Sequence, residues 1–389
     1  MTNKLKNHLT VIKQNGFCSV QDLGRMSSQH LGFSAGGAAD EYAFLYANYL
    51  LCLAQNLSQS DAHIHSVNHS PDNQLLNHHL SLAQLEITLG QITFKAEQSC
   101  TIAITGADCS VCINDKPVNN WQVHHLNTHD IVSFNQPKLG LHSYLAVVGG
   151  IQNKPWLGSR SQTSTEKHLG FNTAPADIIS TDYHIPLAEH CSLSSEKMKS
   201  HNFSSSNFDL EQASKIAFQQ KQLTPSQFYN ELSMPLTLRF IPQTLWHSLS
   251  EKQQTAFCEH QFTISADSNR MGYRLSEMPN DSIKPELEPN LSSNTSSNLN
   301  LSSNTNKKSN LSKPVTFGTI QLPSNNQPIV LMKERQTIGG YPVLGAVIQT
   351  DLFKLSQLRP GNKVQFSPTT LNFAQQQLSA FHQKFHFSN

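Results

Sequence analysis

The sequence has little charge, no long apolar run and few cysteines. Only 14% of its 389 residues are charged, and the formal net charge is +1. A chain so close to neutral has no basic footprint for nucleic acid or for an acidic membrane surface. No apolar run approaches the ~20 residues that span a membrane, and the polar start at Met1 predicts no signal peptide. We therefore expect a cytoplasmic protein that binds neither nucleic acid nor membrane.

Cysteine and histidine do not form recognisable metal or disulfide patterns. The seven cysteines are an odd number and are mostly scattered. Cys109 and Cys112 have CxxC spacing, but the sequence has no second CxxC pair to complete a metal site. Free thiols in a reducing compartment are therefore favoured. The His-rich stretch 57–82 has imidazoles without a thiolate framework, and it reads as an extended polar insert. We expect no metal site.

Several catalytic and cofactor motifs are also missing. The chain has no Gly-x4-Gly-Lys-Ser/Thr phosphate loop and no GxGxxG between a strand and a helix. It has no GxSxG nucleophile elbow and no HExxH pair. Spacing alone therefore predicts only a mainly β protein with a polar cleft.

Short alternating segments with turn residues between them dominate what is present. Leu85, Ile87 and Leu89 alternate with polar residues, and similar segments continue to Ile151. Strands at this spacing indicate an antiparallel β barrel or sandwich. Helices are few, and the clearest lies in residues 34–51, with acids in its first turn. The fold class predicted is mainly β.

Residues 289–313 are rich in Asn and Ser and cannot bury a core, so we expect a disordered insert. The chain length allows about two domains. We expect an N-terminal β subdomain over residues 1–185 and a C-terminal one over residues 186–389.

Two polar clusters stand at the ends of predicted strands. Gln21, Asp22 and Arg25 form either a self-satisfied Asp–Arg loop pair or the lining of a cleft. Arg270 and Arg274 flank Gly272, and they share one face if the segment is extended. Two guanidiniums on one face make a clamp for carboxylate or phosphate, although two surface arginines on an edge strand would show the same pattern.

The most informative stretch runs from 330 to 351. Apolar runs suited to buried strands flank a polar middle that contains Gly339, Gly340 and Pro342. Turn chemistry explains the glycines and the proline as a hairpin. The alternative is that this middle forms one wall of a cleft, facing the 268–275 segment.

These clusters, taken in order, resemble the biotin-dependent carboxyltransferase family that includes the C subunit of 5-oxoprolinase, KipA and the allophanate hydrolase subunit 2-like proteins. The resemblance extends from about residue 8 to 367. Its blocks are residues 20–25, 36–40, 47–48, 85–86, 105–108, 143–150, 158–161, 268–275, 318–323 and 336–342.

The resemblance implies a cyclophilin-like β-barrel architecture. It also implies a partner that is similar to KipI or to the B subunit of 5-oxoprolinase, and a third lactam-utilisation protein similar to the A subunit. With ATP as co-substrate, such a complex opens 5-oxo-L-proline to L-glutamate, and no biotin is attached to this chain. The alternatives are a non-catalytic KipA-like regulator and a component of a urea or allophanate carboxyltransferase.

The resemblance also locates candidate site residues. Hydrogen-bond donors aimed at developing oxyanion charge would serve the reactions of this family, and a carboxylate of Asp108 or Glu334 would orient the lactam N–H or act as a base. The catalytic candidates are Arg270, Arg274, Thr337 and Asp108. The substrate-binding candidates are Gln21, Asp22, Arg25, Asp40, Ser268, Gly272, Gln336, Gly339, Gly340 and Tyr341.

The chain departs from the family pattern in the same region. The usual Asp-Arg before Gln-Thr-Thr-Gly-Gly-Tyr-Pro is Glu334-Arg335, and a hydroxyl is lost at Ile338. The usual Pro-Gly-Pro is replaced at residues 242–244. An altered ligand-binding loop is the expected consequence.

Overall fold

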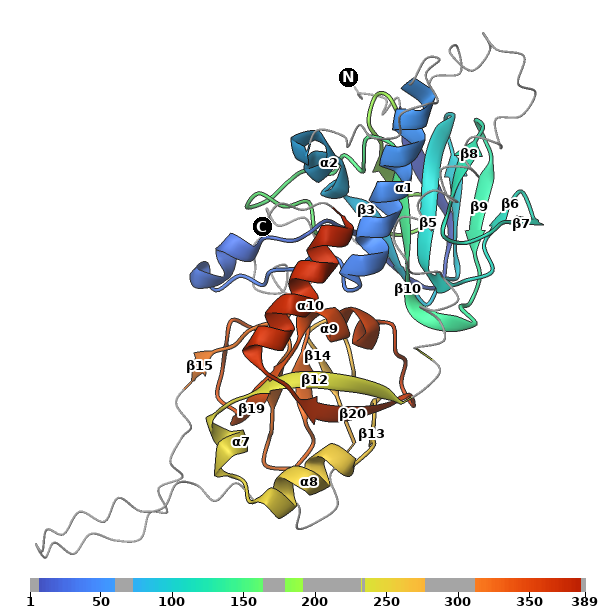
Figure 1. Cartoon of the computed structure of the whole chain (residues 1–389). Coiled ribbons are helices and arrows are strands. Elements are labelled where there is room, and N and C mark those ends of the chain that lie inside the picture. The colour runs from blue at the N-terminus through green and yellow to red at the C-terminus, as the bar shows by residue number, and fades with distance from the viewer. Residues whose placement is uncertain are drawn as a thin grey trace, which may run out of the picture.

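The computed structural model describes residues 7–59, 73–163, 179–191, 232, 235–276 and 312–385. The described residues form two lobes (Figure 1). We call the part up to residue 191 the N-terminal lobe and the part from residue 232 the C-terminal lobe. Both are built mainly from antiparallel strands with few helices, which confirms the predicted mainly β class.

The N-terminal lobe packs two sheets face to face. Alternate residues of the central strands, such as Leu85, Ile87 and Leu145, enter the core between the sheets, as a period of two requires. One sheet has the order β11-β1-β4-β9-β6-β7 and the other β2-β3-β10-β5-β8. The strands are β1 (His8–Gln14), β2 (Phe17–Gln21), β3 (Gln84–Thr88), β4 (Ile92–Ala96), β5 (Cys100–Asp108), β6 (Cys112–Ile113), β7 (Lys116–Pro117), β8 (Gln122–Leu126), β9 (Ile131–Phe134), β10 (Leu139–Val147) and β11 (His184–Pro186).

Helix α1 (Glu41–Gln59) covers the other face of the second sheet, against β5 and β10. The carboxylate of Asp40 accepts a hydrogen bond from Ala43 N (3.1 Å) and so caps the first turn. The helix is buried nearly all round from Tyr42 to Leu51. A helix that is apolar on every side belongs inside a protein, and α1 accordingly lies between the sheet and the C-terminal helix (Figure 1).

The C-terminal lobe is a seven-stranded sheet of order β13-β20-β12-β19-β16-β17-β14. Its two edge strands meet through a bridge between Ile264 and Leu275, so the sheet closes on itself as a barrel does. The strands are β12 (Leu236–Pro242), β13 (Phe262–Thr263), β14 (Gly272–Arg274), β16 (Thr319–Gln321), β17 (Ile329–Leu331), β19 (Val343–Val347) and β20 (Lys363–Pro368), with a separate pair of β15 (Lys313–Pro314) and β18 (Ile338–Gly339).

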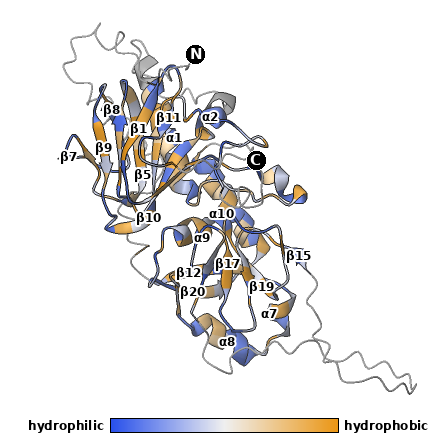
Figure 2. Ribbon diagram, turned by 180° about the vertical axis from the view of Figure 1, so that it is seen from behind, coloured by the Kyte–Doolittle hydropathy of each residue, from blue (hydrophilic) through white to orange (hydrophobic). Residues whose placement is uncertain are grey.

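Helices join the two lobes into one core. The remaining helices are α2 (Asn73–Leu80), α7 (Thr244–Ser248), α8 (Glu251–Glu259), α9 (Gln349–Ser356) and α10 (Leu371–Lys384), with a 3-10 turn η1 (Met26–Leu31). On α10 and just after it, Phe381 and Phe385 contact Tyr42 of α1, with ring centroids 6.4 and 6.0 Å away. Hydrophobic residues line the strands of both lobes (Figure 2), and one buried cluster runs through both.

Three sequence expectations concern inserts and the boundary between the subdomains. The stretch 57–82 is not wholly an extended loop, because α1 continues to Gln59 and α2 occupies Asn73–Leu80. Strand β11 crosses the expected boundary at 185, and Cys191 still packs in the N-terminal core. The expected disordered insert lies outside the described residues except at its last two positions, where Lys313 begins β15.

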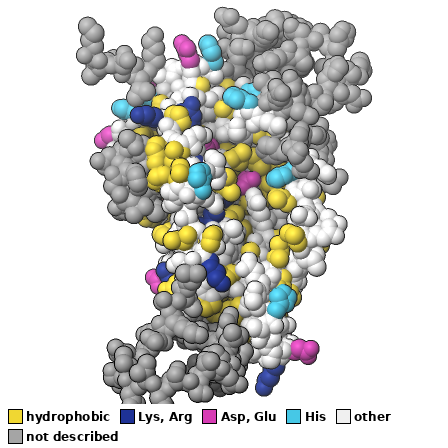
Figure 3. All heavy atoms as spheres, turned by 90° about the vertical axis from the view of Figure 1, so that its left-hand side faces the viewer, with side chains coloured by type: hydrophobic (Ala, Val, Ile, Leu, Met, Phe, Trp, Pro, Cys, Tyr) yellow, Lys and Arg dark blue, Asp and Glu magenta, His cyan; other side chains and the backbone are white. Residues whose placement is uncertain are grey.

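The seven cysteines are all free thiols. Within the described ranges, no group of three or more His, Cys, Asp or Glu side chains is placed to hold a metal ion. The helices of the described chain include none that is long and apolar enough to span a membrane. On the face shown in Figure 3, the basic side chains of the described residues lie singly among hydrophobic and uncharged ones.

Candidate functional site

A cavity of about 740 Å³ lies where the two lobes meet. Pockets of this size suit small-molecule ligands. Its wall combines N-terminal strand residues with the 266–271 and 332–334 segments of the C-terminal lobe. Its lining includes Phe17, Ser19, Thr88, Leu89, His142, Gln162, Thr163, Ser268, Asn269, Arg270, Met271, Lys333 and Glu334.

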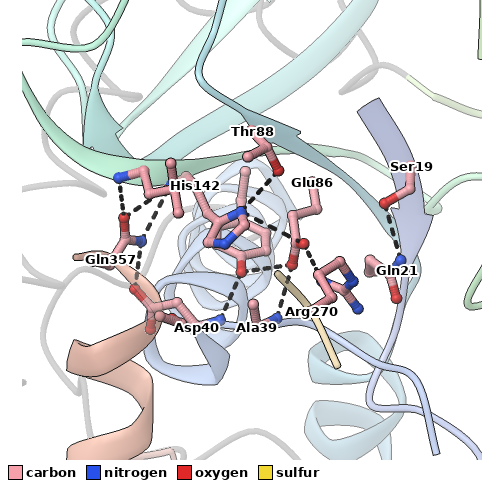
Figure 4. A network of polar contacts seen from close by, with 12 residues as sticks. Ser19, Gln21, Ala39, Asp40, Glu86, Thr88, His142, Arg270 and Gln357 are labelled. Atoms are coloured by element: carbon pink, nitrogen blue, oxygen red, sulfur yellow. Dashed lines mark hydrogen bonds and ion pairs between the residues drawn. The ribbon is translucent and has the colours of Figure 1, made fainter. Parts of the chain in front are cut away.

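Glu86 of β3 is the centre of a buried polar network beside the cavity (Figure 4). Because Leu85 and Ile87 face the sandwich core, Glu86 points to the opposite face, toward the start of α1. Its Oε2 accepts hydrogen bonds from Ala39 N and from the Tyr144 hydroxyl, both at 2.8 Å. The residue is 1% exposed, so these donors replace the water that a carboxylate needs.

Arg270 closes the network from the C-terminal lobe. Its guanidinium pairs with Glu86 Oε1 through Nη1, with Glu334 Oε1 through Nε (2.6 Å), and with Gly37 O through Nη2 (2.7 Å). Burial opposes the ionisation of both Glu86 and Arg270. Their mutual attraction outweighs it, so the pKa of Glu86 falls below, and that of Arg270 rises above, its usual value.

Two other buried groups have pKa values displaced mainly by burial. Desolvation raises the pKa of the Asp40 carboxyl to about 7, although Gln357 and the amides of α1 oppose that rise. Desolvation lowers the pKa of His142 to about 4, although Glu86 opposes that fall. At neutral pH His142 is therefore an uncharged ring, with Nδ1 hydrogen-bonded to the Thr88 hydroxyl (2.9 Å).

Gln357, just after α9, ties the lobes together a second time. Its Nε2 donates to Asp40 Oδ2 (2.8 Å) and to His142 O (2.9 Å). Its Oε1 accepts from the amides of Leu141 and His142, at 2.9 and 3.0 Å. A fully satisfied buried amide of this kind fixes the position of both elements that it touches.

Asp22 holds a loop. Its carboxylate accepts hydrogen bonds from Ser159 Oγ (2.7 Å), Ser161 Oγ (2.6 Å) and Arg160 N (2.6 Å). Arg25 donates to Ser161 O and stacks on Trp156, 5.0 Å from the ring centroid. The expected Asp–Arg loop pair is therefore wrong, because both side chains bind the 156–161 segment.

The structure brings some of the predicted site residues together. Arg270 and Ser268 line the cavity, and Asp40 and Gln21 lie buried near it (Figure 4). The 268–275 segment lies against residues 329–334, through the pairing of Gly272 with Leu331 and a bond from Glu334 N to Arg270 O (2.8 Å). The expected cleft wall was the middle of the stretch, and the cavity lining includes none of residues 336–342. Whether these residues bind substrate stays a prediction.

Other predicted residues lie elsewhere. The shared face of Arg270 and Arg274 is wrong, because β14 covers only Gly272–Arg274 and Arg270 precedes it in a turn. Arg274 is exposed. Asp108, at the end of β5, accepts from Ser110 N (3.2 Å) and is not among the cavity-lining residues.

The Gly-Gly segment forms a surface ribbon instead of a hairpin turn. The turn lies earlier, at Lys333–Glu334, closed by a bond from Arg335 N to Met332 O (3.3 Å). Gly339 belongs to β18, and Gly340 and Thr337 are half-buried beside it. The lining of the cavity includes none of the segment from Gln336 to Tyr341, and both of those end residues are exposed.

Sequence reasoning gave no role to four residues of the network: Glu86, His142, Tyr144 and Gln357. The sequence pattern could have singled out Glu86, because a carboxylate between Leu85 and Ile87 in a predicted buried strand needs a partner. It could not have singled out Gln357, because the bonds of that residue depend on how the lobes meet.

The chain belongs to the family described as carboxyltransferase domain, subdomain A and B, whose family model matches residues 65–368. This confirms the resemblance seen in the sequence at the level of the family. Among similar proteins, the C subunit of 5-oxoprolinase from Escherichia coli (strain K12) is 27% identical over 94% of this chain and 93% of that protein. The Haemophilus influenzae protein of the same name is 25% identical over 92% and 89%. Urea amidolyase of Lachancea kluyveri is 22% identical over 94% of this chain but 17% of that protein.

Solved structures share the fold. The TTHA0988 crystal structure has a TM-score of 0.63 at 19% identity and covers 94% of this chain, which spans 57% of that protein. The urea amidolyase of K. lactis has a TM-score of 0.67 at 19% identity, and this chain spans 20% of its length. At these identities the likeness concerns the fold alone.

Proposed function

We propose that this chain is one subunit of an ATP-dependent 5-oxoprolinase complex, which hydrolyses 5-oxo-L-proline to L-glutamate. The observation that carries the proposal is the 27% identity that extends over 93% of a 5-oxoprolinase C subunit. An inter-lobe cavity lined by both apolar and polar side chains supports it, since such a cavity suits a small cyclic amide. ATP is proposed as co-substrate of the complex.

The geometry favours one division of roles. All three nitrogens of the Arg270 guanidinium are engaged, so we assign Arg270 to positioning the Glu86 and Glu334 carboxylates. Glu334 lines the cavity whereas Asp108 does not, so we assign Glu334 to accept the lactam N–H. Glu334, which stands where the family usually has the shorter Asp, forms an ion pair with Arg270.

The partners proposed are a protein similar to KipI or to the B subunit of 5-oxoprolinase and a third protein similar to its A subunit, in the cytoplasm. The exposed Gln336 and Tyr341, with Thr337, Gly339 and Gly340 between them, are proposed to act at a surface outside the cavity. For the fold, we propose that the closed C-terminal sheet is the cyclophilin-like barrel and that the two lobes are the expected subdomains, with the boundary moved from residue 185 to beyond Cys191.

Reconstitution tests the activity. The chain is co-expressed with both partner types, and glutamate release from 5-oxo-L-proline is measured with and without ATP and with each protein omitted in turn. We expect ATP-dependent release that requires this chain. A stable complex without turnover would support the KipA-like regulator instead, and ATP-dependent carboxylation of urea by a complex that includes a biotin-carrying partner would support the carboxyltransferase component.

A matched pair of variants tests the site. Glu334→Gln removes a cavity carboxylate, and Glu259→Gln removes an exposed one at the end of α8. We expect Glu334→Gln to lower turnover by about 10²-fold or more, which is the usual effect of losing one positioned acid or base. Glu259→Gln should leave turnover unchanged. Equal turnover in an active complex would reject the cavity assignment and leave the activity standing.

A further inference from the structure

Three consecutive charged residues, Lys333, Glu334 and Arg335, lie on the turn that forms part of the cavity wall. All three are buried, with 5%, 5% and 3% of their surface exposed. Buried charges are normally paired, because an unpaired one loses its hydration without compensation. Each of the three therefore calls for a counter-ion.

Two of the three have one. Lys333 Nζ lies 3.2 Å from Glu41 Oε2 on α1. Glu334 Oε1 lies 2.6 Å from Arg270 Nε. Both partners belong to other segments of the chain, so these two ion pairs also fix the turn in place.

Arg335 has no carboxylate partner among the described residues. Its Nη1 makes a 3.5 Å contact with Met332 O, and its Nε is buried without any hydrogen-bond partner. Desolvation lowers the pKa of Arg335 to about 10, which still leaves the guanidinium protonated at neutral pH. A buried, unpaired cation of this kind costs several kcal/mol unless an anion from outside the chain completes it.

A second unpaired donor lies under the same segment. Gln321 of β16 is 1% exposed, and its Nε2 is buried without a partner. That nitrogen lies directly against Gly339, where any Cβ would collide with it. The segment from Arg335 to Gly339 therefore contains one buried donor without an acceptor, Arg335 Nε, and lies against a second, Gln321 Nε2.

We propose that Arg335 binds an oxyanion, which is a carboxylate or phosphate of a small-molecule ligand. Gln321 Nε2, which lies beside the same segment, is a second available donor. The planar guanidinium fork matches either group. Arg335 is not among the cavity-lining residues and the next residue, Gln336, is exposed, so the proposed site lies outside the cavity lining. Because one turn carries both Glu334 and Arg335, an anion at Arg335 would also steady the carboxylate in the cavity wall.

Thermal unfolding of the full chain tests the site without any need for turnover. Tm is measured for the wild type, Arg335→Met and Arg274→Met in sodium chloride, sodium phosphate and sodium acetate, at equal ionic strength and pH. Arg274 is an exposed arginine and controls for general screening. We expect phosphate or acetate to raise the Tm of the wild type and of Arg274→Met above that in chloride, because a ligand of the native state stabilises it.

Arg335→Met should lose that anion-specific rise. In chloride it should be at least as stable as the wild type, because it removes an unpaired buried charge; a purely structural arginine would give a large loss instead. Should Arg335→Met not fold, Arg335→Lys keeps the charge without the fork and should bind the anion about tenfold or more weakly. The anion that raises the Tm identifies the ligand class.

The proposal is overturned if neither anion shifts the wild-type Tm beyond chloride, or if Arg335→Met keeps the shift. It is also overturned if the chain alone ignores both anions while Arg335→Met weakens binding to a partner protein. The counter-ion would then be a carboxylate of that partner. None of these outcomes depends on 5-oxoprolinase activity.

Discussion

Glu86 and Arg270 are 184 positions apart in the sequence and form an ion pair beside the cavity. The side chain of Glu86 is 1% exposed and that of Arg270 21%. The pair joins a strand of the N-terminal lobe to a turn of the C-terminal lobe. The contact between the lobes therefore includes a buried carboxylate that accepts hydrogen bonds from both of them.

Glu86→Gln should destabilise the chain by about 1–3 kcal/mol, because Tyr144 and Ala39 lose a charged acceptor and Arg270 keeps only one of its two carboxylate partners, Glu334. Glu97→Gln is the control, since the partly exposed Lys95–Glu97 pair contributes about 0–1 kcal/mol. Urea unfolding midpoints measure both losses. Similar small losses for the two variants would contradict the role assigned to Glu86.

Asp40 should make the chain less stable as pH rises. Its pKa is about 7 in the folded chain and about 3.9 when unfolded, so the folded state holds the proton more tightly. The stability that this gives is complete below the unfolded pKa and is lost between about pH 4 and 7. Over three units the loss is about 4 kcal/mol.

Asp40→Asn tests this, because Asn caps a helix as well as Asp does but does not titrate. The free energy of unfolding, measured by urea at each pH, should fall more steeply from about pH 4 to 7 in the wild type than in the variant. Parallel curves would show that Asp40 ionises normally in the folded chain.

His142 should have the opposite effect. Its pKa is about 4 in the folded chain and about 6.5 when unfolded, so the unfolded state binds the proton more tightly. Stability is complete above about pH 6.5 and is lost as pH falls toward about 4, by about 3 kcal/mol. In His142→Gln this acid-side loss should disappear. Titration of the ring by NMR gives an independent check, and a ring pKa near the usual value of about 6.5 would contradict it.

Asp22→Asn should loosen the 156–161 loop. The amide can accept fewer of the three bonds that Ser159, Arg160 and Ser161 donate, so a loss of about 1–3 kcal/mol is expected. The matched control is Asp267→Asn, since Asp267 is exposed. Limited proteolysis should cut near Arg160 faster in Asp22→Asn than in the wild type or the control. Unchanged cleavage would mean that the clamp is redundant.

Local periodicity in the sequence was enough to predict several elements of the fold. The alternation of Leu85 and Ile87 gave β3 its core face, and the apolar run after Asp40 gave α1. Helix α2 escaped prediction because it has only eight residues, most of them His, Asn or Gln, and packing against α1 supplies what propensity lacks.

Site prediction fared less well, for a physical reason. The alternation of a strand assigns a face but not a partner, so Glu86 was recognisable as unusual while Arg270 could not be named as its partner. The clamp of Arg270 and Arg274 failed because β14 begins only at Gly272, and a strand boundary depends on the neighbouring strand. Gln357 depends on the meeting of two lobes, which no local pattern encodes.

The parallel pairing of β12 with β20 bears on how the molecule is made. Leu236, in the first strand of the C-terminal sheet, pairs with Val364 in the last. Every described strand of the N-terminal sandwich has been synthesised by Pro186, and N-terminal domains generally fold first on the ribosome. We therefore expect the sandwich to form on the nascent chain before Arg270, the ion-pair partner of Glu86, is in place. The cavity can therefore assemble only after its C-terminal lining, which includes Arg270 and Glu334, has been synthesised.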